Sequence, residues 1–109
     1  VHNLWANINN YKDSNAPHVH QYCMLSGVYY LKAPKNSGNL VLKHPSACLE
    51  YDWNKTKMIE HMEYNSALYN FVPKEGQLLL FPSWVEHFVK PNLNKTQERI
   101  SIAFNIGVL

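Results

Sequence analysis

Prolines and glycines interrupt this chain at short intervals, and their spacing limits its fold more than any other feature. Outside residues 46–72, the segments between the six prolines and four glycines are short. These segments are rich in Val, Ile, Leu, Tyr and Phe, which fit the pleated surface of a sheet. The sequence therefore predicts an all-β domain, either a sandwich or a barrel.

The strands are expected where apolar or alternating segments lie between turn residues. We predict strands at Leu4–Ile8, His18–Tyr22, Leu25–Lys32, Asn39–His44, Gln77–Phe81, Glu86–Lys90 and Arg99–Ile106. Turns are expected at 34–38 and 73–76, where a proline fixes φ and a glycine accepts positive φ. The run 78–81 is apolar throughout, which predicts a strand covered on both faces. The periodicity of residues 55–69 favours neither one or two helical turns nor an extended loop.

Length and composition exclude several classes of protein. A chain of 109 residues fits one domain, 1–109, and 46% hydrophobic with 17% charged residues argues against disorder. The net charge is +2 without a basic block, so we expect no nucleic-acid partner. No apolar run approaches the roughly 20 residues of a membrane span.

The cysteines and the first residue suggest where the domain belongs. Cys23 and Cys48 form no CxxC pair, which fits a reducing compartment, and no export leader is visible. We therefore expect a cytoplasmic protein. Because the chain starts at Val1 without a methionine, we expect it to be the C-terminal part of a longer protein, with the domain lacking an N-terminal extension. If that part of the domain is missing, we expect the fragment to fold as a homodimer.

Three histidines give the strongest chemical signal. His18 and His20 are two residues apart, and such residues point to the same side of a strand, so both imidazoles can approach one ion. His87 is distant in the sequence, but neighbouring strands can bring it close. A His-x-His pair alone is equally consistent with two surface histidines, so both interpretations stay open.

Arg99 is the only arginine of a chain that otherwise uses lysine. A guanidinium binds a carboxylate through two parallel hydrogen bonds, which lysine cannot do. Alternation places Arg99, Ser101, Ala103 and Asn105 on one face of their strand, and this face borders either solvent or a ligand cavity. We expect Arg99 to return on an antiparallel strand next to that of His87. The alternative is a surface ion pair with Glu98 or Glu75.

Taken in order, these residues and their neighbours resemble the iron(II)- and 2-oxoglutarate-dependent oxygenases. The motifs that carry the resemblance are Asn15–His20, Leu25–Leu31, Ser37–Leu40, Gly76–His87 and Glu98–Asn105. The likeness spans about Trp5 to Val108 and is greatest for a group common in phages and marine bacteria, with wider similarity to prolyl hydroxylases. It implies a double-stranded β-helix, which is a jelly-roll, cupin-like barrel.

The resemblance also implies roles for individual residues. It assigns iron(II) to His18, His20 and His87, and the far carboxylate of the cosubstrate 2-oxoglutarate to Arg99, Ser101, Tyr30 and, less directly, Ser26. It requires no general base from the protein. The implied activity is a dioxygenase of the hydroxylase type, with small-molecule partners and a substrate that the sequence does not identify.

One residue departs from the family pattern, because His20 stands where the family has Asp or Glu. Three imidazoles form a neutral set that suits Fe, Zn, Ni and Cu alike. In a second arrangement only one of His18 and His20 binds, and Asp13 or a water completes the site. Two other functions stay open: a three-histidine, cupin-like dioxygenase that uses no 2-oxoglutarate, and an inactive jelly-roll binding domain.

Overall fold

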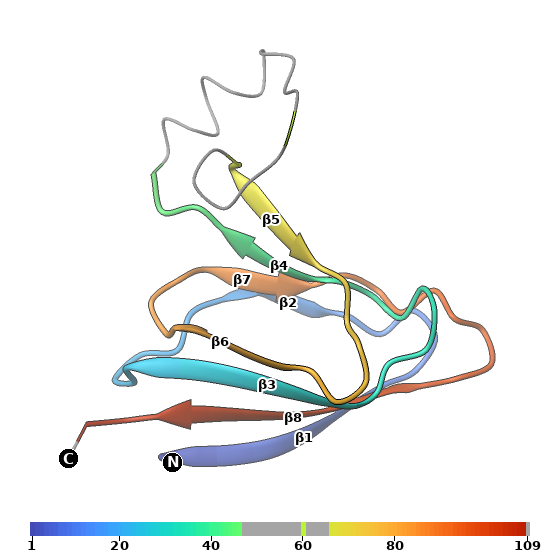
Figure 1. The fold of residues 1–109 in the computed structure, drawn as a ribbon, viewed down its shortest axis with the longest axis horizontal. Helices are drawn as coiled ribbons and strands as arrows, with labels where there is room; N and C mark the ends of the chain where they lie inside the picture. The colour runs from blue at the N-terminus through green and yellow to red at the C-terminus, as the bar shows by residue number, and fades with distance from the viewer. Residues whose placement is uncertain (47–59, 61–65, 109) are drawn as a thin grey trace.

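Two four-stranded antiparallel sheets face each other in the computed structural model, which describes residues 1–46, 60 and 66–108 (Figure 1). The first sheet has the order β1 (Asn3–Asn9), β8 (Arg99–Ile106), β3 (Leu25–Lys32) and β6 (Leu78–Pro82). The second has the order β2 (Asn15–His18), β7 (His87–Val89), β4 (Leu40–Lys43) and β5 (Leu68–Phe71). The described residues form no helix, and the chain passes between the sheets at all but one connection. This arrangement confirms the all-β, jelly-roll prediction.

Two strands differ from the sequence prediction. We expected a strand at 18–22, but β2 ends at His18, and Tyr22 has a φ of 62°. A positive φ turns the backbone away from an extended path, so an extended strand cannot include Tyr22. The short strand β5 was not predicted, and it pairs with β4 from Leu40↔Phe71 to Lys43↔Leu68.

Some expectations concern residues that the structure does not describe. The choice between helix and loop for residues 55–69 lies mostly outside the described part, as does Cys48. The part that is described contains no helix long and apolar enough to cross a membrane.

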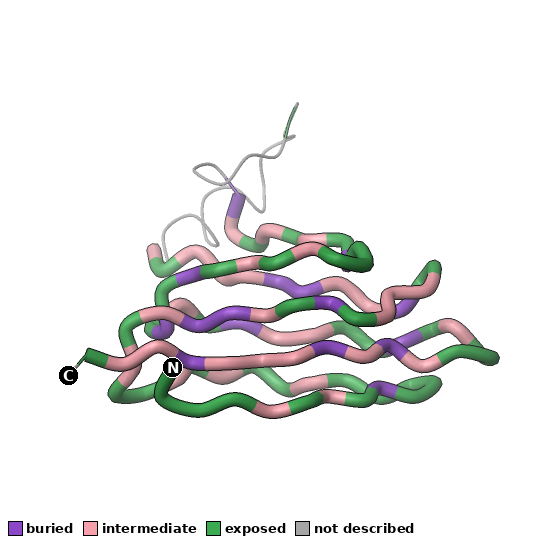
Figure 2. The backbone as a smooth tube through the Cα atoms, turned by 60° about the horizontal axis from the view of Figure 1, so that its bottom comes forward, coloured by how far each residue is buried: buried purple, intermediate pink, exposed green. Residues whose placement is uncertain are grey.

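The inward face of β8 is polar and its outward face is apolar. Along β8, Arg99, Ser101 and Asn105 are buried, and the alternating residues between them are more accessible, as Figure 2 shows for the strands in general. The prediction that the 78–81 strand is covered on both faces is wrong, because Leu78 and Leu80 are 52% and 53% exposed. In the described structure β6 is an edge strand, and only its inward face meets the second sheet.

The expected pairing of the His87 and Arg99 strands is also wrong. Strand β7 belongs to the second sheet and β8 to the first, so the loop between them crosses from one layer to the other. Asn92 is fully buried at this crossing, where its Nδ2 donates to the carbonyl oxygens of Asn9 and Gln97 at 2.9 and 3.0 Å. His87 and Arg99 therefore face each other across the interior.

Candidate active site

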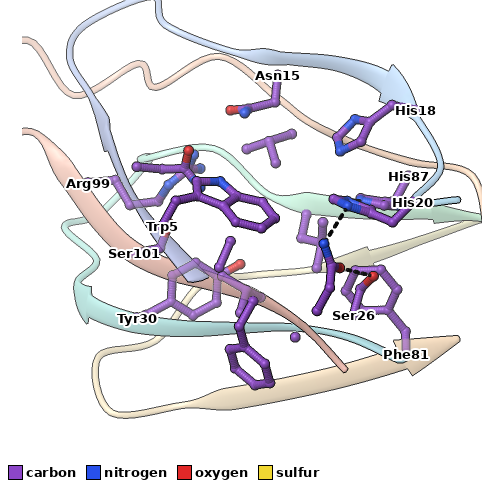
Figure 3. A pocket seen from close by; sticks show the side chains of 18 residues that line it. Trp5, Asn15, His18, His20, Ser26, Tyr30, Phe81, His87, Arg99 and Ser101 are labelled. Carbon is purple, nitrogen blue, oxygen red and sulfur yellow. Dashed lines mark hydrogen bonds between the residues drawn. The ribbon is translucent and has the colours of Figure 1, made fainter. Parts of the chain in front are cut away.

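A pocket of about 110 Å³ lies between the two sheets. A single water needs only roughly 10–15 Å³ of cavity on the same measure, so the pocket can admit a small organic molecule. The three histidines stand at one end, and Arg99, Ser101 and Tyr30 stand at the other (Figure 3).

The histidine end combines a strand pair with the turn that follows it. His18 closes β2 and is the register partner of His87, the first residue of β7. His20 lies beyond the strand, where its backbone N–H donates to the carbonyl of Ser83 at 3.0 Å. One ring nitrogen of each histidine lies within 4.8 Å of the others. The structure thus brings together the three predicted ligands, although His20 arrives through a loop and not through strand alternation.

Backbone carbonyls orient two of the three rings. Nδ1 of His18 lies 2.7 Å from the Ala16 carbonyl, and Nδ1 of His87 lies 2.8 Å from that of Val85. A carbonyl only accepts, so both Nδ1 atoms carry the proton and both Nε2 atoms present a lone pair. Metal-binding histidines are usually oriented in this way.

The histidine cluster favours neutral imidazoles. Burial lowers the pKa of His87 to about 4; the hydrogen bond to Val85 opposes this shift, and the nearby His18 and His20 add to it. The pKa of His20 is also lowered, first by burial and then by His18. Both rings are therefore neutral at pH 7 and can bind a metal without first losing a proton.

Three imidazoles form a donor set that fits a first-row transition metal. In the described part of the chain, no carboxylate belongs to this group of ligands. Asp13, the alternative ligand considered from the sequence, instead accepts the backbone N–H of Asn10 at 2.8 Å.

At the opposite end, Arg99 is buried, and none of the acidic side chains that the structure describes pairs with it. Only 2% of it is exposed, and Nη1 donates to the carbonyls of Ser37 and Gly38 at 3.1 and 2.9 Å. Its Nε is buried and has no hydrogen-bond partner among the described residues. Leaving a buried cation unpaired is costly, so this end of the pocket is suited to an anion.

The alternative of a surface ion pair for Arg99 is excluded by its neighbours. Glu98 pairs with Lys32 at 3.1 Å, and Glu75 accepts the backbone N–H of Ala33. Burial lowers the pKa of Arg99, but its usual value is so high that the guanidinium stays charged at neutral pH.

Two hydroxyl groups accompany the guanidinium. Tyr30 and Ser101 are register partners in the β3–β8 pair, and both are buried in the pocket wall. Burial raises the pKa of Tyr30, while Arg99 acts in the opposite direction, so the phenol keeps its proton and can donate. Ser26, which the resemblance also assigned to the far carboxylate, lies near the histidine end of the pocket. Its hydroxyl contacts Ser83 and Asn105, and Asn105 in turn lies beside His20.

A family model described as "Putative 2OG-Fe(II) oxygenase" matches residues 3–105. The chain belongs to this family. The matched range includes every residue of the histidine cluster and of the Arg99 end. A comparison with curated proteins found no match.

In this member of the 2OG-Fe(II) oxygenase family, three further residues contact the histidines, and the sequence analysis did not identify them. Trp5 stacks on His20 with ring centroids 5.8 Å apart, and Phe81 meets the ring of His87 edge-on at 4.7 Å. Asn105 places its side-chain amide 3.1 Å from Nδ1 of His20. Strand alternation had put Asn105 on the face of Arg99, but no local signal indicated that it reaches a histidine.

Proposed function

We propose that the protein is an iron(II)- and 2-oxoglutarate-dependent dioxygenase of the hydroxylase type. The observation that carries this proposal is a buried guanidinium that has no anionic partner in the described part of the chain, across one pocket from three convergent imidazoles. 2-Oxoglutarate matches both ends, because its keto acid can chelate a metal while its other carboxylate reaches a cation.

In this proposal His18, His20 and His87 hold the iron through neutral nitrogens. The protein then supplies no negative charge among the described ligands, so the dianionic cosubstrate balances the charge of the metal. When bound, iron(II) and 2-oxoglutarate supply the redox chemistry, in which one oxygen atom of O₂ enters succinate, carbon dioxide leaves, and the other oxygen oxidises the substrate.

The residues at the far end bind and orient the cosubstrate. Arg99 offers N–H groups in the fork geometry that matches a carboxylate. Tyr30 and Ser101 add hydroxyl donors from neighbouring strands. Leu40 and Val89 line the same pocket from the second sheet and help to exclude water.

A second candidate function is a three-histidine dioxygenase that oxidises its substrate without 2-oxoglutarate. The absence of a carboxylate from the described ligand group favours this candidate. The buried Arg99 favours 2-oxoglutarate, because this cosubstrate brings a second carboxylate for the cation whatever the substrate is.

Succinate formation tests the proposal. The purified protein is incubated with iron(II), ascorbate and 2-oxoglutarate in air, while metal content is measured in parallel. We expect the unaltered protein to bind one iron and form succinate, and Arg99→Met to keep the metal but lose succinate. Bound metal without succinate from the unaltered protein would favour the second candidate. Failure to bind a transition metal would favour the inactive binding domain.

A further inference from the structure

We propose that two copies of this chain form a twofold symmetric dimer through the outer face of the first sheet. This outer face is the side of β1, β8, β3 and β6 that points away from the pocket. The inference therefore goes beyond the proposed function, and it depends neither on a metal nor on 2-oxoglutarate nor on turnover.

Apolar side chains cover the outer face from one edge of the sheet to the other. Successive strand residues point to opposite sides, so the residues that alternate with Arg99 and Ser101 along β8 point outward. The pairing registers align their neighbours in rows across the sheet. One row consists of Ala6, Ile102, Tyr29 and Leu78. The flanking rows on the same side contain Leu4, Ile8, Ile100 and Leu80.

Much of this apolar surface is in contact with solvent in the single chain. The second sheet lies on the opposite side, across the pocket, so it covers none of the outer face. Five large side chains of the outer face have exposed fractions between 37% and 62%, and these are Leu4, Ile8, Tyr29, Leu78 and Leu80. Contiguous apolar patches of more than a few hundred Å² usually mark a site of interaction.

The size of the outer face suits a stable dimer. Its four strands contain five to eight residues each. With strands about 4.8 Å apart and roughly 3.3 Å per residue, the flat footprint is roughly 450 Å². The accessible area is larger than this footprint, because the side chains stand out from the sheet. It therefore approaches the roughly 600–1,000 Å² that each partner contributes to a standard interface.

The charges at the outer face favour a second copy over a charged partner. The apolar rows named above contain no acidic or basic residue. Lys32 borders them beside Ile100, and it is paired with Glu98 at 3.1 Å. A nucleic acid or an acidic protein surface would therefore find no cation in these rows. An identical apolar face matches them, because a twofold axis brings the same patch of both copies together, and two sheets stack well at about −30°.

Pairing between edge strands is another route to a dimer. Strand β1 lies at the edge of the first sheet, and its seven residues include neither a charge nor a proline, two common protections of an edge. A dimer paired along β1 would lengthen the sheet but leave the outer face in water. Face-to-face packing removes this apolar surface from water, so the exposed side chains point to the face and not to the edge.

Sedimentation equilibrium of the full chain over a range of concentrations tests the inference. We expect twice the mass of one chain at micromolar concentrations. A monomer at all concentrations would overturn the inference, and so would open-ended aggregates, because a twofold interface closes at two copies. A monomer that sediments with vesicles of neutral phospholipid would assign the outer face to a lipid surface instead.

A charge placed on the outer face should dissociate the dimer. Leu80→Glu should raise the dimer dissociation constant at least about 100-fold, because each copy would bury a carboxylate without a partner. Leu93→Glu is the matched control, since Leu93 is 63% exposed in the loop between β7 and β8, outside this face. The control should remain a dimer, and equal dissociation of both variants would contradict the proposed interface.

A second variant separates the face from the edge. Leu4→Glu, on the opposite edge strand, should dissociate the dimer as Leu80→Glu does, because both residues belong to the same face. An effect confined to Leu4→Glu would indicate pairing along β1 and would overturn face-to-face packing. A dimer that survives both substitutions would overturn it as well. Circular dichroism of each variant verifies that the monomer has kept its fold.

Discussion

The guanidinium of Arg99 is held by the backbone carbonyl of Gly38, 2.9 Å away, and by no carboxylate among the residues described. The Ser37 carbonyl makes a similar contact with the same nitrogen. Neutral acceptors fix the position of the cation but leave its charge available. The predicted turn at 34–38 thereby acquires a role in the site, because its carbonyls hold Arg99 in the wall of the pocket.

Replacement of Arg99 by lysine should weaken 2-oxoglutarate binding about 10- to 100-fold, because a charge-assisted hydrogen bond contributes about 1.5–3 kcal/mol and the paired geometry is lost. Calorimetry on the manganese-loaded protein without oxygen measures this affinity. Lys32→Met, which removes a cation outside the pocket, should have little effect. An unchanged affinity in Arg99→Lys would show that the guanidinium does not bind the cosubstrate.

Alanine at Gly38 should reduce both stability and cosubstrate affinity. Gly38 has a φ of 97°, and a Cβ there would collide with the carbonyl oxygen of Lys90. The chain offers a control in Gly76, whose φ is 77° but whose Cβ would meet no atom within 4 Å. Gly76→Ala should cost only the left-handed backbone, about 1–2 kcal/mol, with affinity unchanged. Thermal melts and calorimetry compare them, and equal losses in both variants would contradict the role of this turn.

Metal binding should stabilise the protein through the three histidines together. A ligand that binds only the folded state raises the melting temperature, so a chelator should lower it. Alanine at His18, His20 or His87 should abolish most of the rise seen on adding manganese or zinc. His44→Ala is the matched control, because His44 lies outside the cluster. A similar loss in His44→Ala would indicate nonspecific metal binding.

Tyr30 should make the stability depend on pH in the alkaline range. Burial raises its pKa, so the folded protein keeps a proton that the unfolded chain loses above pH of about 10. The contribution of the protonated Tyr30 to the free energy of unfolding is therefore fully present below that pH. It is lost as the pH rises through the raised pKa of the folded protein. Tyr30→Phe should show a shallower decline in melting temperature between about pH 9 and 11, because phenylalanine has no proton to lose. Each unit by which folding raises the pKa of Tyr30 corresponds to roughly 1.4 kcal/mol of stability lost in alkali. Tyr29→Phe, on the outer face, should follow the unaltered protein.

Strand alternation accounts for what could be predicted at the site. Strands β3 and β8 have the predicted bounds, and the pleat places Arg99, Ser101 and Asn105 on one face regardless of the rest of the fold. The turn at 34–38 was also predictable, because proline and glycine restrict the backbone locally.

The errors arose where a conclusion required knowledge of distant partners. The spacing between His87 and Arg99 allowed a hairpin, but it could not show that β7 and β8 belong to different sheets. The apolar run of β6 indicated two covered faces, although Leu80 points outward from an edge strand. His20 joined the cluster through a turn whose positive φ at Tyr22 had no clear signal in the sequence.

The sequence by itself determined the β class, the turns and the set of polar side chains available for chemistry, because these follow from local backbone preferences and a two-residue period. Tertiary structure alone decided that the polar face of β8 is internal, that Arg99 has no carboxylate partner in the described structure and that Asn105 reaches His20. Those outcomes depend on contacts between residues far apart in the sequence, such as the Asn105–His20 pair, which is separated by 85 positions. Local patterns do not encode which distant strands pair, so only the assembled sheets could reveal them.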